Sequence, residues 1–182
     1  MAPFVAWNNA FTPSEVDRIV EIGDRLVLEK AGIGIAGGHN DDIRITRMAG
    51  FSRTPEAEPI YKKAEYLIQA LNQRVYQFDI TDFSEDFQYT VYEGSEGGHY
   101  DWHVDQGLVQ VNRKLSFSLQ LSEPEDYDGC DLELFTSNEI AKAPRQRGTL
   151  IAFPSYALHR VTPVTRGTRK SLVIWTKGPR FR

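Results

Sequence analysis

Apolar residues recur at helical spacing in two segments of the first half of the chain. The first follows Thr12-Pro13-Ser14-Glu15, a capping-box sequence with proline at the first helical position, and predicts a helix over about residues 13–29. The second predicts a helix over Glu56–Gln73. Both are expected to be scaffold. Their apolar stripes consist of Val16, Ile19, Val20, Ile22 and Leu26 in the first and Ile60, Ala64, Leu67, Ile68 and Leu71 in the second.

The segment Ala31–Asp42 between these helices contains four glycines followed by Asn40-Asp41-Asp42. Such a composition does not favour regular structure, because glycine loses the most conformational freedom on ordering. Two interpretations stay open: a flexible surface loop, or a lid over a substrate.

After about residue 75 the pattern changes to the alternation of β-strands, with turn-forming residues between short apolar runs. This order favours a mainly β fold of the α+β class, a jelly-roll or barrel-like sandwich braced by helices. A single domain over 1–182 is expected, with helical support over about 1–75 and the β core over about 76–182. The expected strands are Arg44–Phe51, Phe87–Tyr92, Tyr100–Val104, Leu115–Leu121, Leu132–Phe135, Thr149–Phe153, His159–Val161 and Ser171–Trp175.

Length and composition agree with one soluble domain: 182 residues, 41% hydrophobic and 25% charged. The net charge of −4 argues against nucleic acid as a partner, because phosphate recognition needs clustered Lys and Arg. Cys130 stands alone, so a reducing compartment is expected. No signal-peptide pattern or membrane-length apolar run is visible, and a cytoplasmic protein without membrane contact is expected. Oligomeric state cannot be read from the sequence.

The segment His99–Asp105 carries the candidate chemistry. Side chains two apart share one face of a strand, so His103 and Asp105 could reach one metal ion, but His99 and Asp101 form a second, overlapping His-x-Asp pair. Spacing alone does not choose between them. A His99/His103 zinc pair on a helix is disfavoured by the Gly97-Gly98 break. By alternation, Trp102 should face away from the metal, and Tyr100 should pack or border the substrate entrance.

A second histidine and an arginine follow downstream. His159 lies 54 residues after Asp105, and Arg169 lies ten residues later. Two histidines and a carboxylate on one face of a metal leave three positions open, which suits non-haem Fe(II). The arginine supplies a planar fork for a dicarboxylate.

Further motifs surround these residues in a fixed order. They are Tyr92, a glycine-containing turn at 94–98, Tyr-x-x-His-x-Asp at 100–105, Gly129-Cys130-Asp131-Leu132, Phe-Pro…His-x-Val-x-Pro-Val at 153–164, and Gly167-Thr168-Arg169. In this order they resemble the Fe(II)/2-oxoglutarate-dependent dioxygenases, specifically the prolyl 4-hydroxylase-like and PKHD-type hydroxylases, over about residues 85–178. The resemblance implies a double-stranded β-helix core. One departure is Cys130, which replaces the second glycine of a Gly-Gly pair.

The resemblance implies a site and a reaction. His103, Asp105 and His159 would bind Fe(II), which settles the choice of frame, and Arg169 would bind the far carboxylate of 2-oxoglutarate. The reaction would consume O2, release succinate and CO2, and hydroxylate an aliphatic C–H of an amino-acid-like or peptidyl, prolyl-type substrate, with ascorbate as a supporting reductant. Further candidate contacts to the co-substrate are Tyr92 and Ser171, and Gln120 would contact co-substrate or substrate from the cavity-lining strand.

Alternatives remain. The same scaffold could demethylate or desaturate its substrate, and a non-catalytic β-sandwich that holds a metal or ligand is a third possibility. Halogenation is disfavoured because Asp105 is present, and nucleic-acid demethylation by the acidic balance. A catalytic Cys130 lacks an apparent partner. The acidic run Glu123–Asp128 would favour a cationic substrate or, as the preferred interpretation, form a solvated turn.

Overall fold

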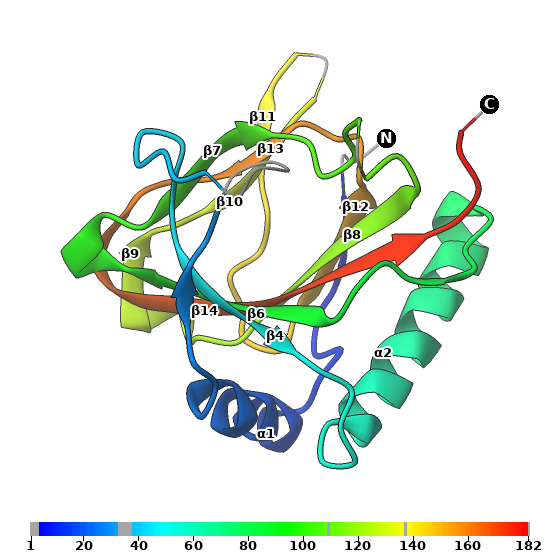
Figure 1. Ribbon diagram of the computed structural model, residues 1–182, viewed down its shortest axis with the longest axis horizontal. Coiled ribbons are helices and arrows are strands. Elements are labelled where there is room, and N and C mark those ends of the chain that lie inside the picture. The colour runs from blue at the N-terminus through cyan, green and yellow to red at the C-terminus, as the bar shows by residue number, and fades with distance from the viewer. Residues whose placement is uncertain (1–3, 33–37, 109, 137, 182) are drawn as a thin grey trace.

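The computed structural model describes residues 4–32, 38–108, 110–136 and 138–181 (Figure 1). Two helices pack on the outer side of a large antiparallel sheet, and a smaller sheet faces its other side. This is the expected jelly-roll core with helical support. The fold prediction is therefore confirmed.

The larger sheet has nine strands in the order β1-β12-β8-β14-β6-β4-β2, with β5 and β9 both paired to β14. Its long central strand, β14, runs from Val164 to Lys177 and extends well beyond the predicted Ser171–Trp175. The other strands are β1 (Val5–Trp7), β2 (Glu29–Lys30), β4 (Arg47–Phe51), β5 (Asp82–Phe83), β6 (Phe87–Glu93), β8 (Arg113–Gln120), β9 (Tyr127–Gly129) and β12 (Leu150–Pro154).

The smaller sheet has five strands in the order β11-β10-β13-β7-β3. Their bounds are β3 (Arg44–Ile45), β7 (His99–His103), β10 (Leu132–Phe135), β11 (Ile140–Lys142) and β13 (His159–Val161). The prediction of one strand over Arg44–Phe51 was wrong: the chain leaves the smaller sheet after Ile45 and enters the larger one at Arg47. The buried Thr46 lies at this crossing, so the two sheets are tied together there.

Helix α1 spans Pro13–Asp24 and begins with the predicted capping box, in which Thr12 and Glu15 bond each other's backbone N–H groups. It ends earlier than predicted, because the chain turns at Arg25 and Glu29 joins strand β2. Helix α2 spans Glu58–Leu71 and continues as a π-helix over Asn72–Tyr76. Two 3₁₀ turns lie at Gly94–Glu96 and Pro124–Asp126.

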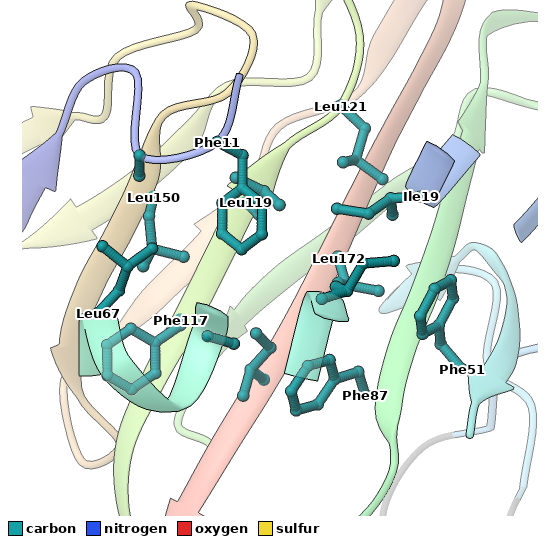
Figure 2. Packing of buried hydrophobic residues seen from close by; sticks show 14 of the residues in the cluster. Phe11, Ile19, Phe51, Leu67, Phe87, Phe117, Leu119, Leu121, Leu150 and Leu172 are labelled. Carbon is teal, nitrogen blue, oxygen red and sulfur yellow. The ribbon is translucent and has the colours of Figure 1, made fainter. Parts of the chain in front are cut away.

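The main core lies between the helices and the larger sheet (Figure 2). Ile19 of α1 and Leu67 of α2 pack on side chains such as Phe117, Leu119 and Leu172, all fully or almost fully buried. Strand β8 is buried on both faces: its apolar side chains face the helices, and Ser116, Ser118 and Gln120 alternate with them. The remaining members labelled in Figure 2 are Phe11, Phe51, Phe87, Leu121 and Leu150.

The segment Ala31–Asp42, for which a surface loop and a lid both stayed open, includes residues 33–37, which lie outside the described residues. Among its described residues, Gly32 lines the central cavity described below. The backbone oxygen of Ala31 lies 3.2 Å from Nδ1 of His39. Within the described part of the chain, no helix has the length and apolar character needed to cross a membrane.

Substitution of Gly23 by alanine tests the contact between α1 and the larger sheet. The added Cβ would lie 2.4 Å from the ring of Tyr89, which is fully buried and hydrogen-bonded to Asp24. Such overpacking typically costs about 1–3 kcal/mol and offsets a helix-propensity gain of about 1 kcal/mol. We expect a net loss of about 1–2 kcal/mol in the free energy of unfolding, measured by urea denaturation.

The matched control is Gly50→Ala in β4, where the nearest atom to the added Cβ is the Asp86 carboxylate at 3.9 Å. This exposed position should change stability by no more than about 0.5 kcal/mol. Equal effects at both positions would contradict the packing described for α1.

Candidate metal centre

Strands β7 and β13 pair with a β-bulge that decides which side chains share a face. Val161 pairs with Tyr100 and His159 with His103, so three residue steps along β7 span the same length as two steps along β13. Bulges re-aim side chains in this way. The rings of Tyr100 and His103 consequently stack on each other, with centroids 3.5 Å apart.

The bulge separates the two overlapping His-x-Asp pairs. The prediction that His99 and Asp101 share the face of His103 was wrong, because strict alternation does not continue through a bulge. His99 contacts the backbone oxygens of Gly97 and Asp42, and Asp101 is exposed. Trp102 packs on Phe135 and Arg160 outside the cavity, as predicted.

His103, Asp105 and His159 come together as a group that could hold a metal ion. Their ligand atoms lie within 4.8 Å of one another, with the Asp105 carboxylate 3.7 Å from His103 Nε2 and 3.5 Å from His159 Nε2. Figure 1 shows the strands that carry the histidines, β7 and β13, running side by side.

Hydrogen bonds fix the orientation of all three ligand groups. The Nδ1 atoms of His103 and His159 lie 2.7 and 2.9 Å from the backbone oxygens of Asp101 and Ala157. A carbonyl oxygen can only accept, so each Nδ1 carries a proton and Nε2 is the ring nitrogen left to bind a metal. Ser116 donates a 2.6 Å hydrogen bond to the Asp105 carboxylate.

The electrostatics of the cluster suit a cation. Burial acts to raise the pKa of Asp105, but His159, His103 and the Ser116 hydroxyl together hold it below its ordinary value. Burial and the neighbouring His159 hold the pKa of His103 well below its ordinary value. At neutral pH the site therefore presents one carboxylate and a neutral imidazole, the protonation states in which these groups bind a metal.

A cavity of about 520 Å³ lies between the two sheets and is lined by this cluster. Arg169 of β14 also lines it, with only 1% of its surface exposed. The guanidinium donates two hydrogen bonds to Gln120 Oε1, at 2.9 and 3.2 Å, and lies 5.6 Å from the ring of Tyr92. No carboxylate pairs with it among the residues that the structure describes.

The other candidate co-substrate contacts divide into two groups. Tyr92 and Ser171 line the cavity, and Ser171 shares a 2.6 Å hydrogen bond with Thr90. Gln120 does not line the cavity. Both ends of its amide are occupied, by Arg169 and by the backbone oxygen of Pro144, so it positions Arg169.

Four site residues were not predicted from the sequence: Arg44, Arg113 and Trp175, which line the cavity, and Ser116, which is hydrogen-bonded to Asp105. Ser116 carried a signal, because it belongs to the polar alternation of β8. Trp175 lies four residues after Ser171 on the same strand, so alternation could have placed both on one face. Arg44 and Arg113 lie in segments whose contacts depend on sheet topology, and the sequence gives no local sign of their role.

Cys130 and the acidic run lie apart from the chemistry. Burial raises the pKa of the Cys130 thiol to about 11, which argues against a nucleophile, although the side chain lies beside Arg169. Cys130 adopts a left-handed φ of 54°, the conformation expected for the glycine it replaces. In the acidic run, Asp128 pairs with the exposed Arg166, which agrees with the preferred interpretation of a solvated turn.

Comparison with known proteins decides the family. Residues 87–177, half of the chain, match the model of the 2OG-Fe(II) oxygenase superfamily. The chain belongs to this superfamily. The three candidate metal ligands and Arg169 lie within the matched residues. The resemblance seen in the sequence is confirmed.

Curated relatives of this 2OG-Fe(II) oxygenase include PKHD-type hydroxylases. That of Teredinibacter turnerae is 41% identical over 85 residues, which cover 43% of this chain and 38% of the relative. That of Acidovorax ebreus is 40% identical over 88 residues, covering 44% and 39%. The matched region thus spans about two fifths of the length of these relatives.

Solved structures of low sequence identity share the fold. A Pseudomonas putida prolyl-4-hydroxylase superposes with a TM-score of 0.80 at 21% identity, over 97% of this chain and 93% of that one. A Trichoplax adhaerens prolyl hydroxylase in complex with a hypoxia inducible factor peptide fragment gives 0.78 at 22% identity, over 96% and 83%.

Substitution of one aspartate at a time tests which His-x-Asp pair binds the metal. We expect Asp105→Ala to weaken binding of Mn(II), an oxygen-insensitive substitute for Fe(II), by more than about 100-fold, since losing a residue that only supports a ligand already costs 10–100-fold. Asp101→Ala, in the overlapping pair, should bind Mn(II) like the wild type. Isothermal titration calorimetry measures both. Normal binding by the Asp105 variant would contradict the assignment.

Proposed function

We propose that residues 1–182 act as one catalytic domain, an Fe(II)- and 2-oxoglutarate-dependent dioxygenase that hydroxylates an aliphatic C–H of an amino-acid-like or peptidyl substrate. One observation carries this: two histidines and a carboxylate face the same cavity as a buried arginine that no carboxylate neutralises within the described chain. The histidines and the carboxylate would bind a metal ion, and the arginine would bind a dicarboxylate.

The three ligand residues fit Fe(II) by donor type, because a set of two histidines and one carboxylate with open positions is typical of non-haem Fe(II) oxygenases. His103, Asp105 and His159 would hold the ion through atoms that their hydrogen bonds already orient. Bound iron, with 2-oxoglutarate and O2, supplies the oxidising power for hydroxylation, and succinate and CO2 are released.

Arg169 would bind the far carboxylate of 2-oxoglutarate through its planar fork. Its pair of hydrogen bonds to Gln120 fixes the guanidinium, and burial strengthens its attraction to an anion. Tyr92, directly opposite Arg169 in the sheet, and Ser171, two residues along β14, would complete the contacts to the co-substrate. A substrate bound in the mouth of the cavity would exclude bulk water from the reacting groups.

The substrate class draws support from the relatives. Proteins of similar fold include prolyl hydroxylases, one of them bound to a peptide, and the curated relatives are named hydroxylases. A small-molecule or peptidyl substrate is consistent with a cavity of about 520 Å³, which can hold a side chain together with the co-substrate.

Succinate formation without any prime substrate tests the function. The anaerobic protein is loaded with Fe(II), 2-oxoglutarate and ascorbate and then exposed to O2. We expect slow succinate release that disappears in His103→Ala and persists in His99→Ala, the neighbouring histidine outside the cavity. If the wild type neither forms succinate nor binds 2-oxoglutarate when loaded with iron, the protein is a binding module instead.

Substitution of Arg169 tests the co-substrate assignment. Removing one member of a buried, hydrogen-bonded charge pair costs about 2 kcal/mol or more, so Arg169→Ala should raise the half-saturating concentration of 2-oxoglutarate about 30-fold or more. Gln120→Leu, which removes one supporting acceptor, should raise it about 3- to 10-fold. Steady-state succinate assays measure both.

Arg166→Ala is the control, because Arg166 lies on the same strand but is exposed and paired with Asp128. Its 2-oxoglutarate requirement should equal that of the wild type. An unchanged requirement in Arg169→Ala would show that another residue binds the co-substrate.

A further inference from the structure

Arg44 is a buried cation that the protein leaves without a counter-ion. Its surface is 9% exposed, and its side chain lines the cavity. The guanidinium makes two long hydrogen bonds, 3.3 Å to the backbone oxygen of Gly32 and 3.5 Å to Gln88, and its Nε has no partner. No carboxylate lies within ion-pair distance among the described residues, and residues 33–37 contain no acidic side chain.

A buried charge in this state is costly. Desolvating a guanidinium without a partner destabilises a folded protein, and such groups are normally paired. A fold that retains an unpaired buried charge beside a reaction cavity therefore gains something from it when the cavity is filled.

Arg44 lies close to the metal ligands. Its guanidinium packs over the ring of Tyr100 at 4.4 Å, and that ring stacks on His103. Arg44, Tyr100 and His103 thus form a continuous stack from β3 to β7 along one wall of the cavity. A group bound to Arg44 would lie one aromatic ring away from a metal ligand.

The other charges lining the cavity balance one another when the proposed ligands are counted. Arg113 pairs with Glu85. Fe(II) and Arg169 together balance Asp105 and the 2-oxoglutarate dianion. The positive charge of Arg44 is then left unbalanced, and one negative charge on a further ligand would neutralise it.

Two further donors in the cavity also lack acceptors. Arg113 Nε and Trp175 Nε1 are buried without a hydrogen-bond partner among the described residues. Both residues belong to the larger sheet, where the guanidinium carbon of Arg113 lies 4.0 Å from the centroid of the Trp175 ring. Together with Arg44 Nε, three unpaired donors belong to side chains that line the cavity. They suit a ligand rich in oxygen acceptors.

We propose that Arg44 binds a carboxylate of the prime substrate, and that the substrate is an amino-acid-like compound or peptide that presents a free carboxylate to the cavity. A carboxylate supplies the single missing charge and matches the planar guanidinium. The inference rests on the proposed function and specifies its substrate class.

The first test is the stability of the protein without ligands. Arg44→Gln removes the unpaired charge and keeps a polar side chain, so its thermal unfolding midpoint should equal or exceed that of the wild type. Arg47→Gln, which removes an exposed partner of Glu96 directly after the sheet crossing at Thr46, is the matched control and should shift the midpoint little. A clear drop confined to Arg44→Gln would mean a structural role and overturn the proposal.

The second test compares N-acetylated amino acids, N-acetylproline included, as free acids and as primary amides. Binding is measured anaerobically as the thermal stabilisation of protein loaded with Fe(II) and 2-oxoglutarate, and then as added succinate formation in O2. At least one free acid should act at a concentration about tenfold or more below that of its amide. The preference should vanish in Arg44→Gln, persist in Arg47→Gln and be partly restored in Arg44→Lys.

The outcomes separate this inference from the function on which it rests. If the wild type releases succinate in the absence of a prime substrate but no free acid outperforms its amide, the carboxylate proposal is wrong and the oxygenase assignment stands. The same conclusion follows if Arg44→Gln keeps the preference, or if it raises the 2-oxoglutarate requirement as much as Arg169→Ala does. Absence of succinate from the wild type overturns the function itself.

Discussion

The pairing of β13 with β7 is the constraint on which the site depends. It brings His159 against His103 although 55 residues separate them in the chain. The bulge in the same pairing turns Tyr100 and His103 to one face and leaves Asp101 outside. The backbone oxygens of Asp101 and Ala157, each two residues before its histidine, then orient both imidazole rings. The arrangement of the three candidate metal ligands is thus a consequence of sheet register. The helices affect it only by bracing the larger sheet.

The cavity also contains buried charged side chains that lack ion-pair partners. Asp105, Arg169 and Arg44 are buried or nearly so, and none has an oppositely charged Asp, Glu, Lys or Arg partner among the described residues. Each costs stability in the empty protein. A metal, a dicarboxylate and a carboxylate-bearing substrate would neutralise them one by one. The apolar core between the helices and the larger sheet supplies the stability that lets the fold keep these charges apart.

Much of the fold was predictable, because local signals agreed with it. The capping box at Thr12 set the start of α1, and Leu132–Phe135 and His159–Val161 were predicted with their observed bounds. The single strand over Arg44–Phe51 failed, since a change of sheet at Thr46 leaves no mark on a short apolar run. Alternation allowed His99 and Asp101 as ligands because the bulge depends on long-range pairing. The roles of Gln120 and Arg44 depend equally on contacts between distant strands.

The most direct test of the proposed site is an anaerobic absorption titration. A 2-oxoglutarate chelated to protein-bound Fe(II) gives a visible charge-transfer band that neither component gives alone, and the band needs no turnover, oxygen or prime substrate. We expect the band to appear when both are added to the wild type. If the protein binds Fe(II) and 2-oxoglutarate but no band develops, the two do not meet in one site, and the arrangement proposed around His103, Asp105, His159 and Arg169 is wrong.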